Sequence, residues 1–200
     1  MIHLIHGVGS QRPDDKPTFG HELTKRLKKR GLDTKEVYWS QVLDPIERKA
    51  LDRIGMSRHL PSRQFLAMSA MDAVLWGFYR TELESCVANQ VKDDAPVIVA
   101  HPLGSVIVWD TIGRSIYYCK ALVLIGSPVQ MFIDCNLLHP IIIKTVPVFN
   151  FWSATDPVSF PIDHPAVTNI QLRGLGPAPM SHSAYWEDKR VAEKIAEVAK

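Results

Sequence analysis

The stretch Val97-Ile-Val-Ala-His-Pro-Leu-Gly-Ser-Val-Ile-Val-Trp109 decides the fold that this sequence predicts. Residues 97–100 form a short apolar run rich in β-branched side chains, which is typical of a buried strand. A turn at His101 and Pro102 follows, and the apolar residues from Leu103 onward indicate a buried helix. A strand that turns directly into a helix is the repeating unit of a parallel α/β sheet.

The same alternation of strand and helix continues along the chain. We therefore predict a single α/β domain over residues 1–200, with a three-layer, doubly wound, mostly parallel sheet of six strands. Ligands of such sheets bind outside the carboxyl ends of the strands, and we expect the segment 41–95 to be helical and to line the mouth of that site. The other predicted strands are 2–5, 35–39, 121–125, 146–152 and 167–172, and the predicted helices are 19–31, 65–88, 103–114 and 187–198.

Apolar side chains recur every three to four residues in the predicted helix 65–88. This spacing places them on one face of the helix, and we interpret that face as core packing rather than as a ligand surface. The residues on this face are Phe65, Met68, Met71, Leu75 and Phe78.

Composition and charge indicate which kinds of partner and location this protein should not have. A formal net charge of +2 gives no reason to expect nucleic acid as a partner. No apolar run approaches the roughly 20 residues that a membrane span needs, and we expect no span. The spacing of the three cysteines, Cys86, Cys119 and Cys135, is not that of metal ligands. We expect their thiols to be buried and the protein to be cytoplasmic.

An aspartate and, later in the chain, a histidine follow the predicted strands and could act together as an acid–base pair. Asp156 comes just after the strand 146–152, and His182 lies in a predicted loop before the last helix. An aspartate bonded to one imidazole nitrogen fixes the tautomer, so that the other nitrogen can act as a base. Near the start of the chain, His6 and Gly7 open a glycine-bearing loop that lacks the lysine and the spacing of a phosphate-binding loop.

These segments together resemble the α/β-hydrolase superfamily, and in particular its small bacterial esterase- or lipase-like members. The resemblance extends over nearly the whole chain, and the motifs are specific in combination although each is short. It implies a minimal form of that fold without the leading hairpin. The segments are His6-Gly-Val-Gly-Ser-Gln11, Ala100-His-Pro-Leu-Gly-Ser105, Gly126-Ser-Pro128, Asp156-Pro-Val-Ser159 and His182-Ser-Ala-Tyr-Trp186.

The resemblance also implies a role for each matching position. Position 102, Asp156 and His182 would form the catalytic triad of a serine hydrolase, with no cofactor and no metal. The substrate would be a small ester or acyl-like molecule. The backbone N–H groups of Val8 and Leu103 would form the oxyanion hole, supported by His6, Gly7, His101 and Gly104.

Pro102 occupies the position of the nucleophilic serine, which is where this sequence departs from the family pattern. Proline has no nucleophilic side chain, so no acyl-enzyme can form there. The serine of a nucleophile elbow sits in a strained turn, whereas proline is locked at φ near −65° and suits the first turn of a helix. We therefore expect a relaxed elbow and a chain that is inactive as an esterase.

Other residues could in principle take over the missing or neighbouring roles. Ser105 and Ser10 are the alternative nucleophiles, although Ser105 should point along its own helix and Ser10 should belong to the oxyanion loop. The alternatives to Asp156 and His182 are Asp134 and Asp163 for the acid, and His164 and His6 for the histidine.

Three functions remain open at this point. The first is an esterase-like scaffold that has lost its nucleophile. The second is a non-catalytic module that binds a ligand or a partner on the same fold. The third is an enzyme that needs only His182 and Asp156 as a general base. The oligomeric state is not predicted.

Overall fold

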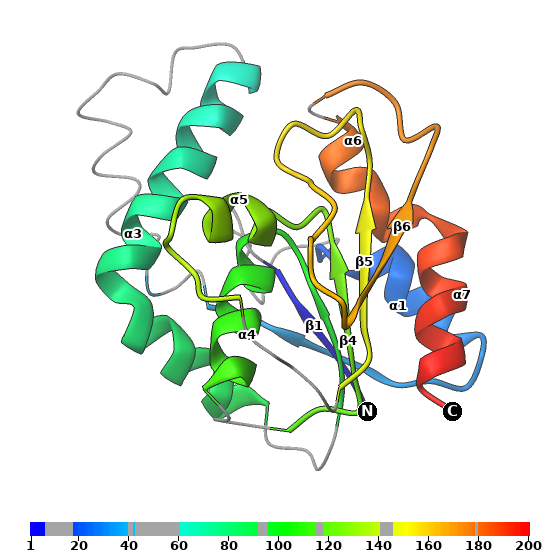
Figure 1. Ribbon diagram of the computed structural model, residues 1–200. Helices are drawn as coiled ribbons and strands as arrows, with labels where there is room; N and C mark the ends of the chain where they lie inside the picture. Colours follow the sequence, from blue (N-terminus) through cyan, green and yellow to red (C-terminus); the bar gives the residue numbers. More distant parts are fainter. Residues whose placement is uncertain are drawn as a thin grey trace.

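The computed structural model describes residues 1–6, 18–39, 42, 61–91, 96–114, 118–140, 146–178 and 180–200, without the side chains of 61–72. Its centre is a sheet of six parallel strands in the order β2-β1-β3-β4-β5-β6 (Figure 1). This confirms the predicted fold class. The strands are β1 (Ile2–Ile5), β2 (Thr34–Val37), β3 (Val97–Ala100), β4 (Ala121–Ile125), β5 (Val148–Trp152) and β6 (Val167–Gln171).

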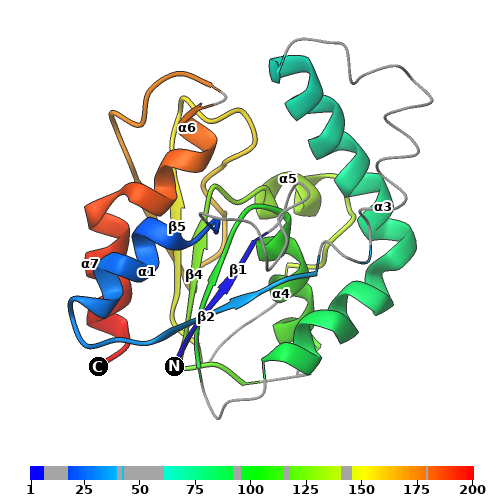
Figure 2. The same ribbon diagram turned by 180° about the vertical axis from the view of Figure 1, so that it is seen from behind.

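Helices cover both faces of the sheet, as Figures 1 and 2 show from opposite sides. One core joins the sheet to α3 (Pro61–Gln90), α4 (Leu103–Gly113) and α5 (Val129–Asp134), and a second joins it to α1 (His21–Lys28) and α7 (Lys189–Val198). Strands buried on both faces are near-continuous apolar runs, and every residue of β3 and β4 is buried. The short helix α6 (Met180–Ser183) and the 3₁₀ turn η2 (Ala184–Glu187) precede α7.

The order of the strands determines where a site can form. After β1 the chain passes to β2 on one side and then returns to β3 on the other side of β1. Such a reversal opens a crevice at the carboxyl ends of the two central strands, which is where doubly wound sheets bind ligands. His6 follows β1 and His101 follows β3, so both histidines lie at this reversal.

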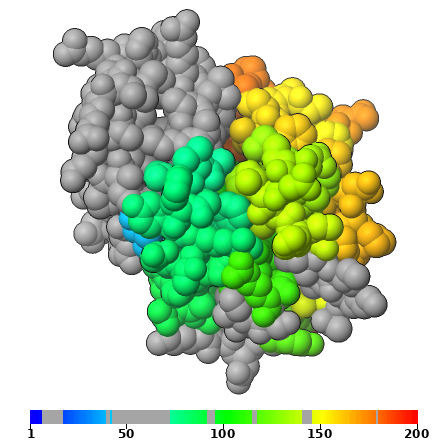
Figure 3. Space-filling view, turned by 60° about the vertical axis from the view of Figure 1, so that its left-hand side comes forward, coloured from blue at the N-terminus to red at the C-terminus, as the bar shows by residue number. Residues whose placement is uncertain are grey.

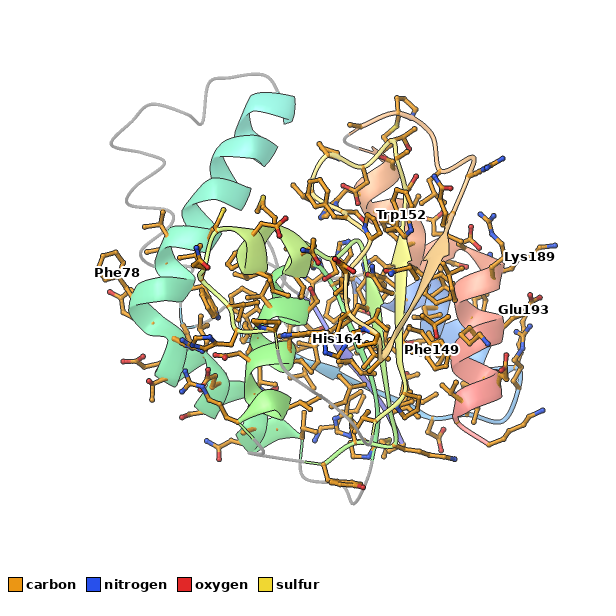
Figure 4. All side chains as sticks on the ribbon, in the orientation of Figure 1. Phe78, Phe149, Trp152, His164, Lys189 and Glu193 are labelled. Atoms are coloured by element: carbon orange, nitrogen blue, oxygen red, sulfur yellow. The ribbon has the colours of Figure 1, made fainter. Side chains whose placement is uncertain are left out.

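The residues that helix α3 buries differ in part from those predicted for its apolar face. Phe78 is 79% exposed and points away from the protein (Figure 4), so its assignment to the core was wrong. Tyr79 has non-helical dihedral angles of −112° and 22°. The buried face of α3 is formed by Trp76, Leu83 and Val87. Leu75 packs against the core as predicted, whereas Phe65, Met68 and Met71 lie outside the described side chains.

The exposed side of α3 lies beside that of α5 in Figure 3. The described part of the segment 41–95 is helical over Pro61–Gln90, and its role at the mouth of the site stays a prediction. The predicted short helix between residues 45 and 61 falls outside the described residues.

The three cysteines were expected to be buried. Cys119 is buried, Cys86 is partly buried and Cys135 is exposed, so the prediction was wrong for Cys135.

Four charged side chains join α3 to α4. Arg80 donates from two nitrogens to the two carboxylate oxygens of Asp110, and its Nε lies 3.3 Å from Glu84 Oε1. Arg114 Nη1 lies 3.7 Å from Glu84 Oε2. Glu84 and Asp110 are 5% and 3% exposed. Buried charges need such pairing, because desolvation of an unpaired charge costs several kcal/mol.

Burial and the neighbouring Asp110 raise the pKa of Glu84 from an ordinary 4.5 to about 7. A carboxyl group whose pKa is higher in the folded than in the unfolded chain stabilises the folded chain at pH values below its unfolded-state pKa. This contribution is lost as the pH rises toward its folded-state pKa. Relative to Glu84→Gln, the unfolding free energy of the native protein should therefore fall between about pH 4.5 and pH 7 and then level off. Urea unfolding across this range measures the difference, with the exposed Glu82→Gln as control. Parallel curves of unfolding free energy against pH for the native protein and Glu84→Gln would contradict the prediction.

Candidate active site

A buried histidine–aspartate pair lies beyond the carboxyl end of β5. His182 Nδ1 lies 2.9 Å from Asp156 Oδ2 and 3.0 Å from Oδ1. The two residues are 5% and 3% exposed. A carboxylate oxygen can only accept, so the Nδ1–H of His182 is the donor and Nε2 is the nitrogen with the basic lone pair. This is the tautomer that a general base requires.

Two further groups hold the carboxylate of Asp156. The Oη of Tyr185 donates to Asp156 Oδ2 at 3.0 Å, and the N–H of Val158 donates to Oδ1 at 3.2 Å. Burial and the charge of Asp156 raise the pKa of Tyr185, so the phenol keeps its proton and remains a donor. Sequence reasoning gave Tyr185 no role, because nothing in the stretch after His182 shows that its ring turns inward.

His6 and His101 bring two more imidazole rings to this site. The centroid of the His101 ring lies 4.6 Å from that of His182 and 5.8 Å from that of His6. Burial and the proximity of His182 lower the pKa of His6 to about 3. The same two causes, with a contribution from His6, lower the pKa of His101 well below its ordinary value. Both rings are therefore neutral at physiological pH.

Pro102 is the N-cap residue of α4 and has helical backbone angles, φ −73° and ψ −50°. Its backbone thus lacks the positive φ of a strained elbow, and the turn continues smoothly into the helix. The Oγ of Ser105 donates to the carbonyl of Pro102 and lies 2.7 Å from Ser127 Oγ. Ser105 is fully buried in this arrangement, which leaves it poorly placed to attack a bound molecule.

Gly104 has a packing role in the first turn of α4. A Cβ at this position would lie 2.9 Å from the carbonyl oxygen of Ile5 and 3.1 Å from that of His6. No side chain fits there without a shift of backbone, so glycine lets α4 lie against the end of β1. Leu103, the first residue of the helix, is 3% exposed. The N–H of Ser105 donates to the carbonyl of Pro102 at 3.1 Å, and the oxyanion role of the Leu103 N–H stays a prediction.

The remaining predicted positions have different outcomes. Gly7, Val8 and Ser10 lie outside the described residues. His182 was expected in a loop but lies in α6, a helix of a single turn whose sequence signal is too short to recognise. His182 and Asp156 are in contact although 26 residues separate them.

The alternative acids and histidine do not take part in this pair. Asp134 accepts a hydrogen bond from Gln130 on an exposed part of α5. Asp163 and His164 precede β6, at the opposite end of that strand from the site; His164 is labelled in Figure 4. Within the described residues, no three His, Cys, Asp or Glu side chains gather into a metal-binding group. None of the described helices combines the length and the apolar character that crossing a membrane would require.

A parallel sheet in this strand order, with helices on both faces, is an α/β-hydrolase-like three-layer fold. Among solved structures, a candidate hydrolase of the α/β superfamily from Xanthomonas campestris pv. campestris matches with a TM-score of 0.53. The two chains are 17% identical, and the match covers 98% of this chain and 96% of the other. At that identity the likeness shows the fold alone. No family model and no curated protein matches this chain.

Proposed function

We propose that this protein holds the acid and base of an esterase site and, as the sequence stands, forms no acyl-enzyme. The observation that carries this proposal is the 2.9 Å contact between His182 Nδ1 and Asp156 Oδ2 in a buried environment. That geometry prepares His182 Nε2 to take a proton from a nucleophile at position 102, where Pro102 offers none. The molecule that fits the site would be a small ester or acyl-like compound.

The cellular setting belongs to the same proposal. Cys86, Cys119 and Cys135 form no disulfide. Cysteines without disulfides are typical of proteins from a reducing compartment, which supports a cytoplasmic location.

The substitution Pro102→Ser tests the proposal directly. We expect a burst and then turnover of p-nitrophenyl acetate or butyrate, whereas the native protein and Pro102→Ala give neither. We also expect Pro102→Ser to be less stable to urea than the native protein by about 1–3 kcal/mol, because the strained turn of an elbow carries that cost. A folded Pro102→Ser variant without burst or turnover would contradict the proposal.

The intact pair also supports a second candidate function. A base that is oriented and buried can remove a proton from a bound molecule, or from water, without any covalent step. In that case the native protein would itself carry an activity, and His182→Ala would abolish it. Saturable ligand binding by the native protein, with no reaction in either variant, would instead indicate a non-catalytic binding module.

A further inference from the structure

His101 contacts the backbone of the residue that would act as the base. Its Nε2 lies 2.7 Å from the carbonyl oxygen of His182. A carbonyl oxygen can only accept, so Nε2 of His101 carries a proton and donates it. This bond joins the first residue after β3 to α6, across 81 residues of sequence.

The other ring nitrogen supports the same tautomer. Among the described residues, His101 Nδ1 is buried and has no hydrogen-bond partner. A proton on Nδ1 would leave a buried donor unsatisfied and turn the lone pair of Nε2 toward that of the carbonyl, both of which are costly. Burial also holds His101 neutral, because it lowers the pKa of the ring. The ring is therefore a fixed single donor.

A glycine next to His101 leaves space for its ring to lie close to the carbonyl of His182. Gly126 follows β4 with φ +58°, a conformation that side chains rarely adopt. A Cβ on Gly126 would lie 2.9 Å from Cδ2 of His101, 3.0 Å from its Nε2 and 3.0 Å from the ring of Tyr185. Glycine at this position leaves the space that the ring of His101 needs to reach the carbonyl of His182.

We propose that His101 is a positioning residue whose Nε2–H holds the backbone of His182, so that the His182 ring stays aligned with Asp156. The proposal deepens the function proposed above and rests on it for its catalytic meaning. In this proposal His101 acts through the backbone of His182 and takes no part in the reaction itself. Its geometry requires a donor at Nε2, not an aromatic ring alone.

Two substitutions separate the donor from the ring. His101→Phe keeps an aromatic ring and removes the donor. His101→Gln removes the ring and keeps a donor nitrogen at the same number of bonds from the backbone. A positioning role predicts that Gln preserves the site and Phe disrupts it. A role in packing alone predicts the reverse order.

The first readout needs no catalysis and uses the native Pro102 chain. In protein labelled with ¹⁵N-histidine, we expect a slowly exchanging Nδ1–H signal from His182, bonded to Asp156. This signal should broaden or vanish in His101→Phe and persist in His101→Gln. An unchanged signal in His101→Phe, or its loss in His101→Gln alone, would overturn the proposal. If His101→Phe does not fold, Gly126→Ala displaces the same ring and should lose the signal too.

The second readout is activity in the Pro102→Ser background. There His101→Phe should lower kcat by about 10- to 100-fold with little change in KM, since a misplacement of about 1 Å can cost that much. His101→Gln should recover most of the loss. Without turnover in Pro102→Ser the proposed function fails, but the NMR result still decides the role of His101. An equal kcat in all three proteins would overturn the positioning role.

Discussion

Replacing His182 with alanine in the Pro102→Ser variant should lower kcat for p-nitrophenyl esters by at least about 10³-fold. The restored hydroxyl depends on a base to accept its proton, and the members of such a triad act as one unit. Asp156→Asn should give a loss of similar size, because the amide would favour the wrong tautomer of His182. Steady-state kinetics and the size of the burst, both in the Pro102→Ser background, measure these effects.

His164→Ala is the matched control for this prediction. His164 was an alternative for the catalytic histidine, and it precedes β6, at the opposite end of that strand from the site. Its replacement should leave kcat in the Pro102→Ser background within about twofold. Equal kcat for the His182→Ala and His164→Ala variants would show that the ester cleavage does not use His182.

Replacing Asp110 with alanine should destabilise the protein by about 3 kcal/mol. Removing one partner of a buried ion pair costs about 3–5 kcal/mol, because the other charge stays buried without compensation. We expect the lower end of that range, since the side chain of Arg80 is 27% exposed and can recover part of its hydration. Glu84 would keep only the more distant contacts with Arg80 and Arg114.

Urea unfolding of Asp110→Ala at pH 7 measures this loss. Asp134→Ala is the control, because Asp134 is exposed and accepts a single hydrogen bond from Gln130. The control should change the free energy of unfolding by less than about 0.5 kcal/mol. A loss below about 1 kcal/mol for Asp110→Ala would mean that the four charges between α3 and α4 are largely hydrated.

The sequence predicts the sheet well because its strands are buried on both faces. Residues 97–100 and 121–125 are unbroken apolar runs, and the structure places β3 and β4 at the same bounds. The edge strand β2 begins at Thr34 rather than at the predicted residue 35, and it has only one fully buried residue. A run of mixed polarity gives weaker boundaries than a continuous apolar one.

Local patterns fail where tertiary contacts decide the outcome. Phe78 fits the predicted apolar spacing, but the structure exposes it and buries Trp76 on the other side of α3. The helix α6, which carries His182, has only four residues and no periodic signal. Likewise, the bond from His101 to the carbonyl of His182 joins segments 81 residues apart and has no sequence signature.

The candidate acid and histidine were predicted from the order of motifs along the chain. Asp156 and His182 were singled out because they follow strands in the order that the family resemblance implies, and the structure brings their side chains together. The φ of −73° at Pro102 follows from the ring of proline itself. The role of Gly104 was visible only in three dimensions, since it depends on how closely α4 approaches β1.

The most direct test of the central claim is the covalent capture of position 102. The Pro102→Ser variant is incubated with a fluorophosphonate, digested and mapped by mass spectrometry. We predict one phosphonyl adduct per chain at position 102, lost when His182→Ala is added and absent from the native protein and from Pro102→Ala. A folded Pro102→Ser variant that carries no adduct, or carries it at Ser105, would contradict the claim that this chain holds an esterase site lacking only its nucleophile.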